Sequence, residues 1–374
     1  MPTEVLPDET HLRQARRERA VAQMEAHDID VLLLGREANA RYFTGAPRLW
    51  TAGTRPYGPG CVAVRSTRAI HLVSTWDEGM PDDIPHENLF GITWNPGNLF
   101  AWLQGIEGAD AAKRIGTDSL TPRFAQMLPK LFPNAEFIDA EPMLEAARRI
   151  KTPEEIEALG VAASVTEIAL AAAIDALRPG VTARHLTAVF METMAANGVT
   201  TPATQRVAWV SRGPLPSGPT WVEEEIGPDD LVAFDAGVVA GGYTAEIGRT
   251  WPANPDGVND ETKQLSKKSD ELWAALWAAC QPGVSCVGLL DAYSSVGQVL
   301  PPMPIAFGLG LGFDVPVVSA HLPKTAAQEQ LEPGMVLAVT ALVNGDARSI
   351  LRKEIVHIEE SGPVLLSHSP LWRA

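Results

Sequence analysis

Hydrophobic and polar residues follow two periods along the chain, and these periods predict strands and helices in turn. Residues 10–27 form a charged amphipathic pattern typical of a helix, and the apolar run "DVLLLG" at 30–35 predicts a buried strand. The segments "GCVAVRS" and "AIHLVST" predict further strands, while "KRIGTDS" and "EFIDAEP" bracket the helical segment "PRFAQMLPKLF". Strands that alternate with helices up to about residue 140 predict a small α/β domain.

A domain boundary is predicted at "RRIKTPEEIEAL", residues 148–159. Thr152 is a good N-cap, Pro153 suits the first helical position, and Glu155 completes a capping box. The following segment "ASVTEIALAAAIDAL" is apolar on nearly all sides, so we expect a buried helix. We therefore predict an N-terminal domain at 1–148 and a catalytic domain at 149–374.

The second part of the chain predicts an α+β domain. "LVAFDAG" and "GYTAEIGRTW" predict a hairpin that turns at Gly241-Gly242, and helices are expected at 261–280 and 286–299. The last third, with "IAFGLGLGFDV", "GMVLAVTALV" and "SILRKEIVHIEE", is rich in strand-forming residues. Helices on one face of a mainly antiparallel sheet are the expected arrangement.

The composition of the chain limits the classes of binding partner to be expected. A formal charge of −16 argues against nucleic acid or an anionic membrane as the main partner, since both require a basic surface. The N-terminus lacks the apolar region of a signal peptide, and we find no uncharged apolar run as long as a membrane span. Three widely placed cysteines match neither a disulfide framework nor a zinc site, so we expect a cytoplasmic protein.

The predicted hairpin carries Asp235 and Glu246, eleven residues apart. Carboxylates on adjacent strands either hold a metal or perform acid–base chemistry. Rival motifs are weak, because "GLGLGF" has no helix after it and the chain contains no G-x-S-x-G, P-loop or H-E-x-x-H sequence.

Six segments follow one another along the chain: "NARYFTGA", "RIKTPEEIEAL", "LVAFDAGVVAGGYTAEIGRTWP", "FGLGLGFDVP", "LEPGMVLAVT" and "LRKEIV". In this order they resemble the creatinase/prolidase/aminopeptidase P family, the pita-bread fold of the M24 peptidases. The resemblance implies an α+β pita-bread C-terminal domain after a smaller α/β creatinase-type N-terminal domain. It also implies a homodimer.

The chain departs from this family at the metal ligands. Family peptidases hold two divalent metals with Asp, Asp, His, Glu and Glu, and the corresponding residues here are Asp235, Glu246, Phe307, Thr340 and Glu354. No His lies between His185 and His321, so a local shift of the alignment cannot supply one. We therefore expect no dinuclear metal centre and no cofactor, although three carboxylates leave open one weakly bound hard cation such as Mg²⁺.

Without metals, the resemblance implies that Asp235, Glu246 and Glu354 converge in one pocket and act as an acid/base set. Like charges so close would raise the pKa of at least one carboxyl group. Arg352 lies two residues before Glu354 on the same strand, so it faces the same side and would orient that carboxylate or grip an anionic substrate. The alternative is that the carboxylates are relics held by Arg352 or Arg249 in a buried ion pair.

Further residues are candidates for the substrate pocket, by resemblance or as aromatic walls: Phe307, Thr340, Asp314, Tyr243, Trp209, Trp221, Arg55 and His321. Arg55, in "GTRPYGPG", resembles a creatinase segment through which one subunit reaches its partner's active site, but an ordinary loop arginine is as good an interpretation. Tyr243 and the tryptophans are equally compatible with packing.

These observations predict a metal-independent hydrolase or lyase that acts on a small substrate with a C–N or similarly activated bond. Two alternatives remain. One is a catalytically inactive member of the fold that binds a ligand or partner, and the other is a residual Xaa-Pro-type metallopeptidase.

Overall fold

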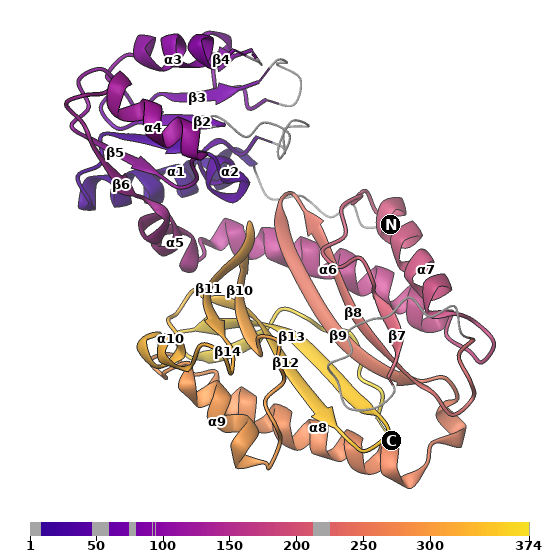
Figure 1. Cartoon of the computed structure of the whole chain (residues 1–374). Coiled ribbons are helices and arrows are strands. Elements are labelled where there is room, and N and C mark those ends of the chain that lie inside the picture. Colours follow the sequence, from indigo (N-terminus) through magenta and orange to yellow (C-terminus); the bar gives the residue numbers. More distant parts are fainter. Residues whose placement is uncertain are drawn as a thin grey trace. The chain divides into compact units, whose positions relative to one another are not determined.

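The computed structural model describes residues 9–46, 60–74, 80–91, 93, 95–211 and 225–373. Contacts divide this chain between Arg148 and Arg149 into an N-terminal and a C-terminal unit. Figure 1 shows both units in the colours of the sequence.

The N-terminal unit is built on a six-stranded sheet of order β4-β3-β2-β1-β5-β6. β1 pairs in parallel with β5 and antiparallel with β2, and β5 pairs in parallel with β6. The elements are α1 (Glu9–Ala26), β1 (Val31–Leu34), α2 (Glu37–Thr44), β2 (Cys61–Val64), β3 (Ile70–Val73), η1 (His86–Asn88), β4 (Leu89–Phe90), α3 (Pro96–Gly105), β5 (Arg114–Thr117), α4 (Pro122–Leu131), β6 (Glu136–Asp139) and α5 (Glu141–Arg149).

All four residues of β1 are buried, as the apolar run predicted. Asp118, just after β5, accepts hydrogen bonds from the backbone N–H groups of Gly35 and Arg36 and from the Asn39 side chain. Burial raises the pKa of Asp118, yet three donors hold its carboxyl group against the start of α2. The α/β character predicted for this part of the chain is therefore confirmed.

The C-terminal unit is built on an eight-stranded antiparallel sheet of order β11-β10-β12-β13-β9-β8-β7, with β14 also paired to β13. Its elements are α6 (Pro153–Asp175), α7 (Ala183–Ala196), β7 (Ala208–Val210), β8 (Leu231–Ala240), β9 (Tyr243–Pro252), η2 (Pro255–Gly257), α8 (Asp260–Ala279), α9 (Val287–Ser295), β10 (Ala306–Gly310), β11 (Gly312–Val318), α10 (Pro323–Gln328), β12 (Val336–Asn344), β13 (Ser349–Glu359) and β14 (Gly362–Leu365).

The predicted β8–β9 hairpin is confirmed. Strand pairing runs without interruption from Leu231↔Pro252 to Ala240↔Tyr243. Gly241 and Gly242 form the turn with φ of 56° and 91°, a conformation that glycine adopts without steric cost.

Helix α6 begins as the sequence predicted. Thr152 and Glu155 form both hydrogen bonds of the capping box, and the second Glu155 oxygen accepts a hydrogen bond from the Tyr243 hydroxyl. By length and composition alone this helix could cross a membrane, but half of its most apolar stretch is buried, and it packs on β8 and β9 (Figure 1). Helices in the core of a globular domain often have this length and apolar composition.

The large sheet has two chemically different faces. On the helix-covered face, Leu337, Val339 and Val356 pack in one core with Leu272 and Leu276 of α8. The opposite face, here called the site face, carries the side chains that alternate with these along each strand. Side chains two residues apart on a strand share a face, and adjacent ones do not. This alternation therefore decides which polar residues can meet on the site face.

Candidate active site

Four residues form a straight row across the site face. Asp235 on β8 lies directly opposite Gly248 on β9, Gly248 opposite Lys353 on β13, and Lys353 opposite Thr340 on β12. Residues directly opposite each other project on the same side of a sheet. Glu246 precedes Gly248 by two residues, so it shares this face.

Lys353 joins the two carboxylates of the hairpin. Its Nζ donates to Asp235 Oδ1 at 2.6 Å and to Glu246 Oε2 at 2.8 Å. To reach Asp235 the lysine extends across β9 at Gly248, where a Cβ atom would lie 2.7 Å from Lys353 Cβ. The missing side chain at residue 248 therefore makes room for the lysine.

Burial and charge set the protonation of this triad of Asp235, Glu246 and Lys353. Burial opposes the charge on Lys353, but the two carboxylates outweigh it and raise the pKa of the ammonium group above its ordinary value. Burial also raises the pKa of Glu246; Lys353 counteracts that rise and the negative charge of Asp235 adds to it. Asp235 is the accessible member, with 27% of its side chain exposed against 6% for Glu246.

Aromatic and apolar side chains flank the triad. The Phe307 ring centre lies 5.9 Å from Lys353 Nζ, and Phe313 packs edge-on against Phe307 with ring centres 4.8 Å apart. On the other side, Trp209 lies opposite Ala233, two residues from Asp235, and packs with Leu342 and Leu351. Phe307, Thr340 and Trp209 thus share the site face.

The expectation that Glu354 converges with Asp235 and Glu246 is wrong. Glu354 follows Lys353 along β13 and therefore projects from the helix-covered face. There it accepts hydrogen bonds from Arg249 and Arg352, both at 2.9 Å, and from Ser367 at 2.7 Å. The alternative interpretation, a carboxylate held by Arg249 and Arg352 in a buried ion pair, describes Glu354 correctly.

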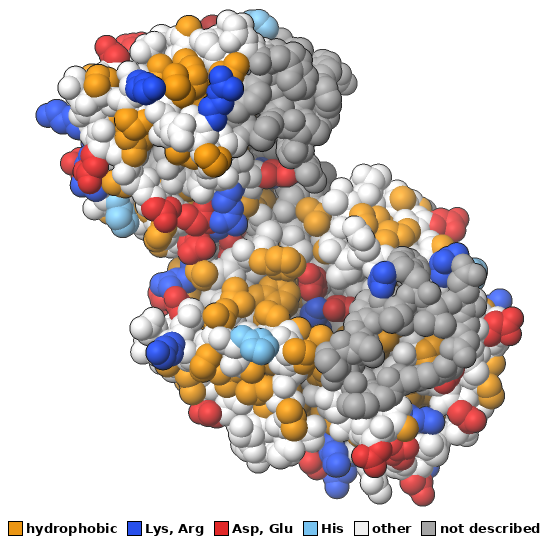
Figure 2. All heavy atoms as spheres, viewed as in Figure 1, with side chains coloured by type: hydrophobic (Ala, Val, Ile, Leu, Met, Phe, Trp, Pro, Cys, Tyr) orange, Lys and Arg blue, Asp and Glu red, His pale blue; other side chains and the backbone are white. Residues whose placement is uncertain are grey.

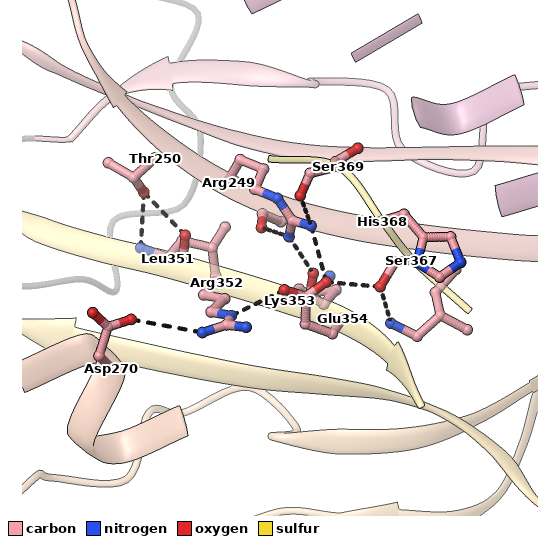
Figure 3. Close-up of polar contacts among 12 residues, drawn as sticks. Arg249, Thr250, Asp270, Leu351, Arg352, Lys353, Glu354, Ser367, His368 and Ser369 are labelled. Atoms are coloured by element: carbon pink, nitrogen blue, oxygen red, sulfur yellow. Dashed lines mark hydrogen bonds and ion pairs between the residues drawn. The ribbon is translucent and has the colours of Figure 1, made fainter. Parts of the chain in front are cut away.

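Arg352 faces the same side as Glu354, as predicted, but that side is not the site. Figure 3 shows Arg352 extending between Glu354 and Asp270 of α8. Its guanidinium carbon also lies 4.3 Å from the centre of the Trp273 ring. Burial lowers the pKa of Arg352, whereas Glu354 favours its charge. Arg352 therefore stabilises the sheet–helix contact and does not orient a group on the site face.

Three other predicted pocket residues have structural roles or lie elsewhere. Asp314 pairs with Lys151 at 2.9 Å, with both side chains almost completely buried. Tyr243 is fully buried on the helix-covered face, where its hydroxyl group bonds to Glu155. His321 is exposed in the segment between β11 and α10. Arg55 and Trp221 lie outside the described residues.

The donor set does not fit the dinuclear metal centre that the family resemblance implies. Of the five positions, Phe307 offers no donor and Thr340 only a neutral hydroxyl, while Glu354 faces away from Asp235 and Glu246. In the part of the chain that the structure describes, no group of three or more His, Cys, Asp or Glu residues could hold a metal ion. Lys353 instead brings a positive charge within hydrogen-bonding distance of both carboxylates.

Lys353 is the member of the triad that sequence reasoning missed. Matching the letter Glu in "LRKEIV" placed Glu354 at the site, but strand alternation allows only one of two adjacent residues to face it. Two carboxylates close together on one hairpin also call for a positively charged side chain nearby. Lys353, directly before Glu354 in the sequence, is such a side chain. Charge balance was the signal that could have identified it.

Comparisons with known proteins agree with this architecture. The family model "Metallopeptidase family M24" matches residues 157–362, and "Creatinase/Prolidase N-terminal domain" matches residues 16–150. The Xaa-Pro dipeptidase of Lactobacillus helveticus is 29% identical over 209 residues, which cover 51% of this chain and only 55% of that protein. The creatinase of Bacillus sp. (strain B-0618) is 22% identical over 337 residues, 84% of this chain and 79% of that protein.

The fold is also that of solved structures. The prolidase from Pyrococcus horikoshii OT3 superposes with a TM-score of 0.77 at 20% identity, covering 96% of this chain and 99% of that one. Identity this low supports the fold alone. The match of the family model over more than half of the sequence decides membership, and the chain belongs to metallopeptidase family M24.

Proposed function

We propose that this protein is a metal-independent hydrolase or lyase that acts on a small substrate with a C–N or similarly activated bond. One observation carries the proposal: the Lys353 ammonium group binds Asp235 and Glu246 together on the face where the family resemblance implies metals. A metal ion bound by these carboxylates would have to displace that ammonium group or share them with it.

Each member of the triad has a distinct part in the proposed reaction. Asp235 is accessible and contacts the substrate. Glu246 is buried and holds the Lys353 ammonium group in place. Lys353 stays charged, because the two carboxylates raise its pKa, and it orients Asp235 through a hydrogen bond.

For hydrolysis the atoms balance as follows. Asp235 takes a proton from water while the water oxygen attacks the substrate carbon. The C–N bond then breaks, and Asp235 gives that proton to the leaving nitrogen. One water is consumed, the triad regains its starting charge, and general acid–base catalysis of this kind contributes roughly 10²–10⁴-fold in rate.

Metal content and turnover test the proposal together. Protein purified without chelator is analysed for Mn, Co, Zn and Fe, and hydrolysis of Xaa-Pro dipeptides and of a panel of small amides and amidines is measured with EDTA or with added Mn²⁺. We expect metal far below one ion per chain and turnover of a panel member that is insensitive to EDTA. Stoichiometric metal with Mn²⁺-dependent dipeptide hydrolysis would instead establish a metallopeptidase.

A second candidate, a non-catalytic binding protein, is favoured by one observation: the triad closes on itself, because Lys353 already pairs with both carboxylates. Asp235→Asn and Glu246→Gln separate the two candidates. Loss of an EDTA-insensitive turnover in both variants supports the enzyme, whereas a ligand that binds the wild type without any turnover supports the binding protein. The family name alone does not favour either.

A further inference from the structure

Trp209 carries a hydrogen-bond donor that the protein itself does not use. Its indole N–H is buried and has no hydrogen-bond partner within the described residues. A buried donor without a partner costs free energy, so such a group calls for a specific explanation. An acceptor atom that arrives with a ligand would satisfy this donor.

Strand pairing places Trp209 close to Asp235. Trp209 on β7 lies directly opposite Ala233 on β8, and Asp235 follows Ala233 by two residues. Trp209 and Asp235 are therefore diagonal neighbours on the site face, with Cα atoms roughly 7–8 Å apart, a separation that an aromatic side chain spans. The unused donor thus belongs to a residue next to the proposed base.

Packing holds the Trp209 ring on the site face. The ring packs against a cluster formed by Ala233, Leu342 and Leu351. Leu351 precedes Lys353 by two residues on β13, so this apolar cluster runs beside the polar row of the triad. A donor that packing holds in advance is the kind of group that stabilises a charge developing during a reaction.

The far side of the triad is apolar as well. The Phe307 ring centre lies 5.9 Å from Lys353 Nζ, and Phe313 packs edge-on against Phe307. Figure 2 shows hydrophobic side chains gathered over the β10–β11 part of the C-terminal unit. In such surroundings a hydrogen bond to a charged acceptor is stronger than it is in water.

Two other donors of the site face are less suitable partners for a substrate at Asp235. Lys353 Nζ already donates to Asp235 and to Glu246. Thr340 lies three strands away from Asp235 in the order of the sheet, which is roughly 14 Å at about 4.8 Å per strand. Among these three residues, Trp209 alone has an unused donor and lies next to Asp235.

We infer that Trp209 is a further catalytic residue, whose indole N–H donates a hydrogen bond to the substrate oxygen that becomes negative as water attacks the neighbouring carbon. This inference rests on the proposed function, because it supplies a donor for the charge that attack by water creates. An indole N–H can only donate, so the substrate must present an acceptor to it. A carbonyl oxygen is such an acceptor, whereas an amidinium group carries only N–H donors.

Indole N–H signals test the inference without turnover. The chain has ten tryptophans, and in the ¹⁵N-labelled full-length protein each gives one indole signal. The signal that is absent from the Trp209→Phe variant belongs to Trp209. Acetamide and acetamidinium have nearly the same shape, but only acetamide offers an acceptor oxygen. We expect acetamide to shift the Trp209 proton signal downfield in a saturable manner, and acetamidinium to cause no such shift.

Trp251 is the matched control. Its indole N–H is also buried without a partner within the described part of the chain, but it follows Arg249 by two residues on β9 and so lies on the helix-covered face. Acetamide should leave the Trp251 signal in place. For any amide that the protein hydrolyses, Trp209→Phe should lower kcat roughly 100-fold with little change in KM. Trp251→Phe should leave both constants unchanged.

A Trp209 signal that acetamide leaves in place, or that shifts no further than the Trp251 signal, would overturn the inference. Hydrolysis of an amide that is unchanged in Trp209→Phe would also overturn it, and would leave the proposed function standing. If acetamide shifts the Trp209 signal in a protein that hydrolyses no panel member without metal, the indole donor binds an acceptor and only the proposed function fails.

Discussion

Gly248 lies directly opposite Lys353 on the neighbouring strand, and a methyl group at residue 248 would be 2.7 Å from Lys353 Cβ and 2.9 Å from its backbone nitrogen. The lysine thus crosses the sheet where β9 carries no side chain. Asp235, opposite Gly248 on the next strand, is the acceptor at the end of that path. The triad depends on this one glycine.

Gly248→Ala should displace Lys353 from Asp235. Contacts this short between a Cβ atom and a neighbouring strand force the backbone or the lysine to move, so we expect a loss of about 1–3 kcal/mol in the free energy of unfolding. Any turnover should fall with it. Urea denaturation measures the stability change.

Gly160→Ala is the control for this change. Gly160 lies in α6 with no atom within 4 Å of the added Cβ, so alanine should stabilise the unit by up to about 1 kcal/mol through helix propensity. If both alanine variants were equally stable, the short contact at Gly248 would have no effect on the free energy of unfolding.

Lys353→Met should destabilise the protein in a pH-dependent manner. Without the ammonium group, Asp235 and Glu246 face each other as like charges, so the pKa of Glu246 rises further in the folded state. A carboxyl group with a higher pKa in the folded than in the unfolded state binds its proton more tightly when folded. The free energy of unfolding of the variant should therefore fall as pH rises through the raised pKa of this carboxyl group.

Unfolding at pH 5 and pH 8 measures this dependence. We expect a loss of about 3–5 kcal/mol at pH 8 and a smaller loss at pH 5. The wild-type lysine behaves differently: its contribution is complete below its ordinary pKa of 10.5 and is lost only as pH rises from there through the raised folded value. Lys324→Met, at an exposed lysine in α10, should show no such difference; a pH-independent loss at Lys353 would contradict the charge argument.

Glu354→Gln should act on stability. The substitution leaves Arg249 and Arg352 without their shared carboxylate in a buried setting, and we expect a loss of about 3–5 kcal/mol. Asp270→Asn removes the other carboxylate near Arg352, at a side chain that is 60% exposed, and should cost less than about 1 kcal/mol. Full stability of Glu354→Gln combined with loss of turnover would return Glu354 to the site.

The cysteine thiols should be unreactive in the folded protein. Burial raises the pKa of Cys280 to about 12 and that of Cys286 to about 11, and Cys61 is shifted in the same direction. Labelling with a thiol-specific reagent at pH 8 should therefore proceed only on unfolding, at three cysteines per chain. Rapid modification of one cysteine in native buffer would show that its thiol is accessible.

Local sequence patterns were sufficient to predict the framework of the site. Alternating apolar residues and two glycines located the β8–β9 hairpin, and the Thr152–Glu155 capping box located the start of α6, because turn and cap chemistry act over a few residues. Phe307 and Thr340, which the family resemblance named as pocket residues, lie on the same face as Lys353.

What the sequence did not provide was the register between distant strands. Gly248 and Lys353 are brought together by the pairing of β9 with β13, and only that pairing shows which of Lys353 and Glu354 faces Asp235. A shift by one residue reverses every side chain on a strand, so a one-letter error in β13 exchanged a structural glutamate for the central lysine of the triad.

The segment 367–369 also completes the surroundings of a buried cation far from it in the sequence. Arg249 is almost fully buried, yet it donates to the Ser369 carbonyl and to Glu354, and Glu167 accepts from the backbone N–H groups of His368 and Ser369. Ser369 follows Arg249 by 120 residues, so a distant segment completes the surroundings of this guanidinium group. Removal of residues 367–369 would take one acceptor from a buried cation, and this would cost free energy even with the sheet intact.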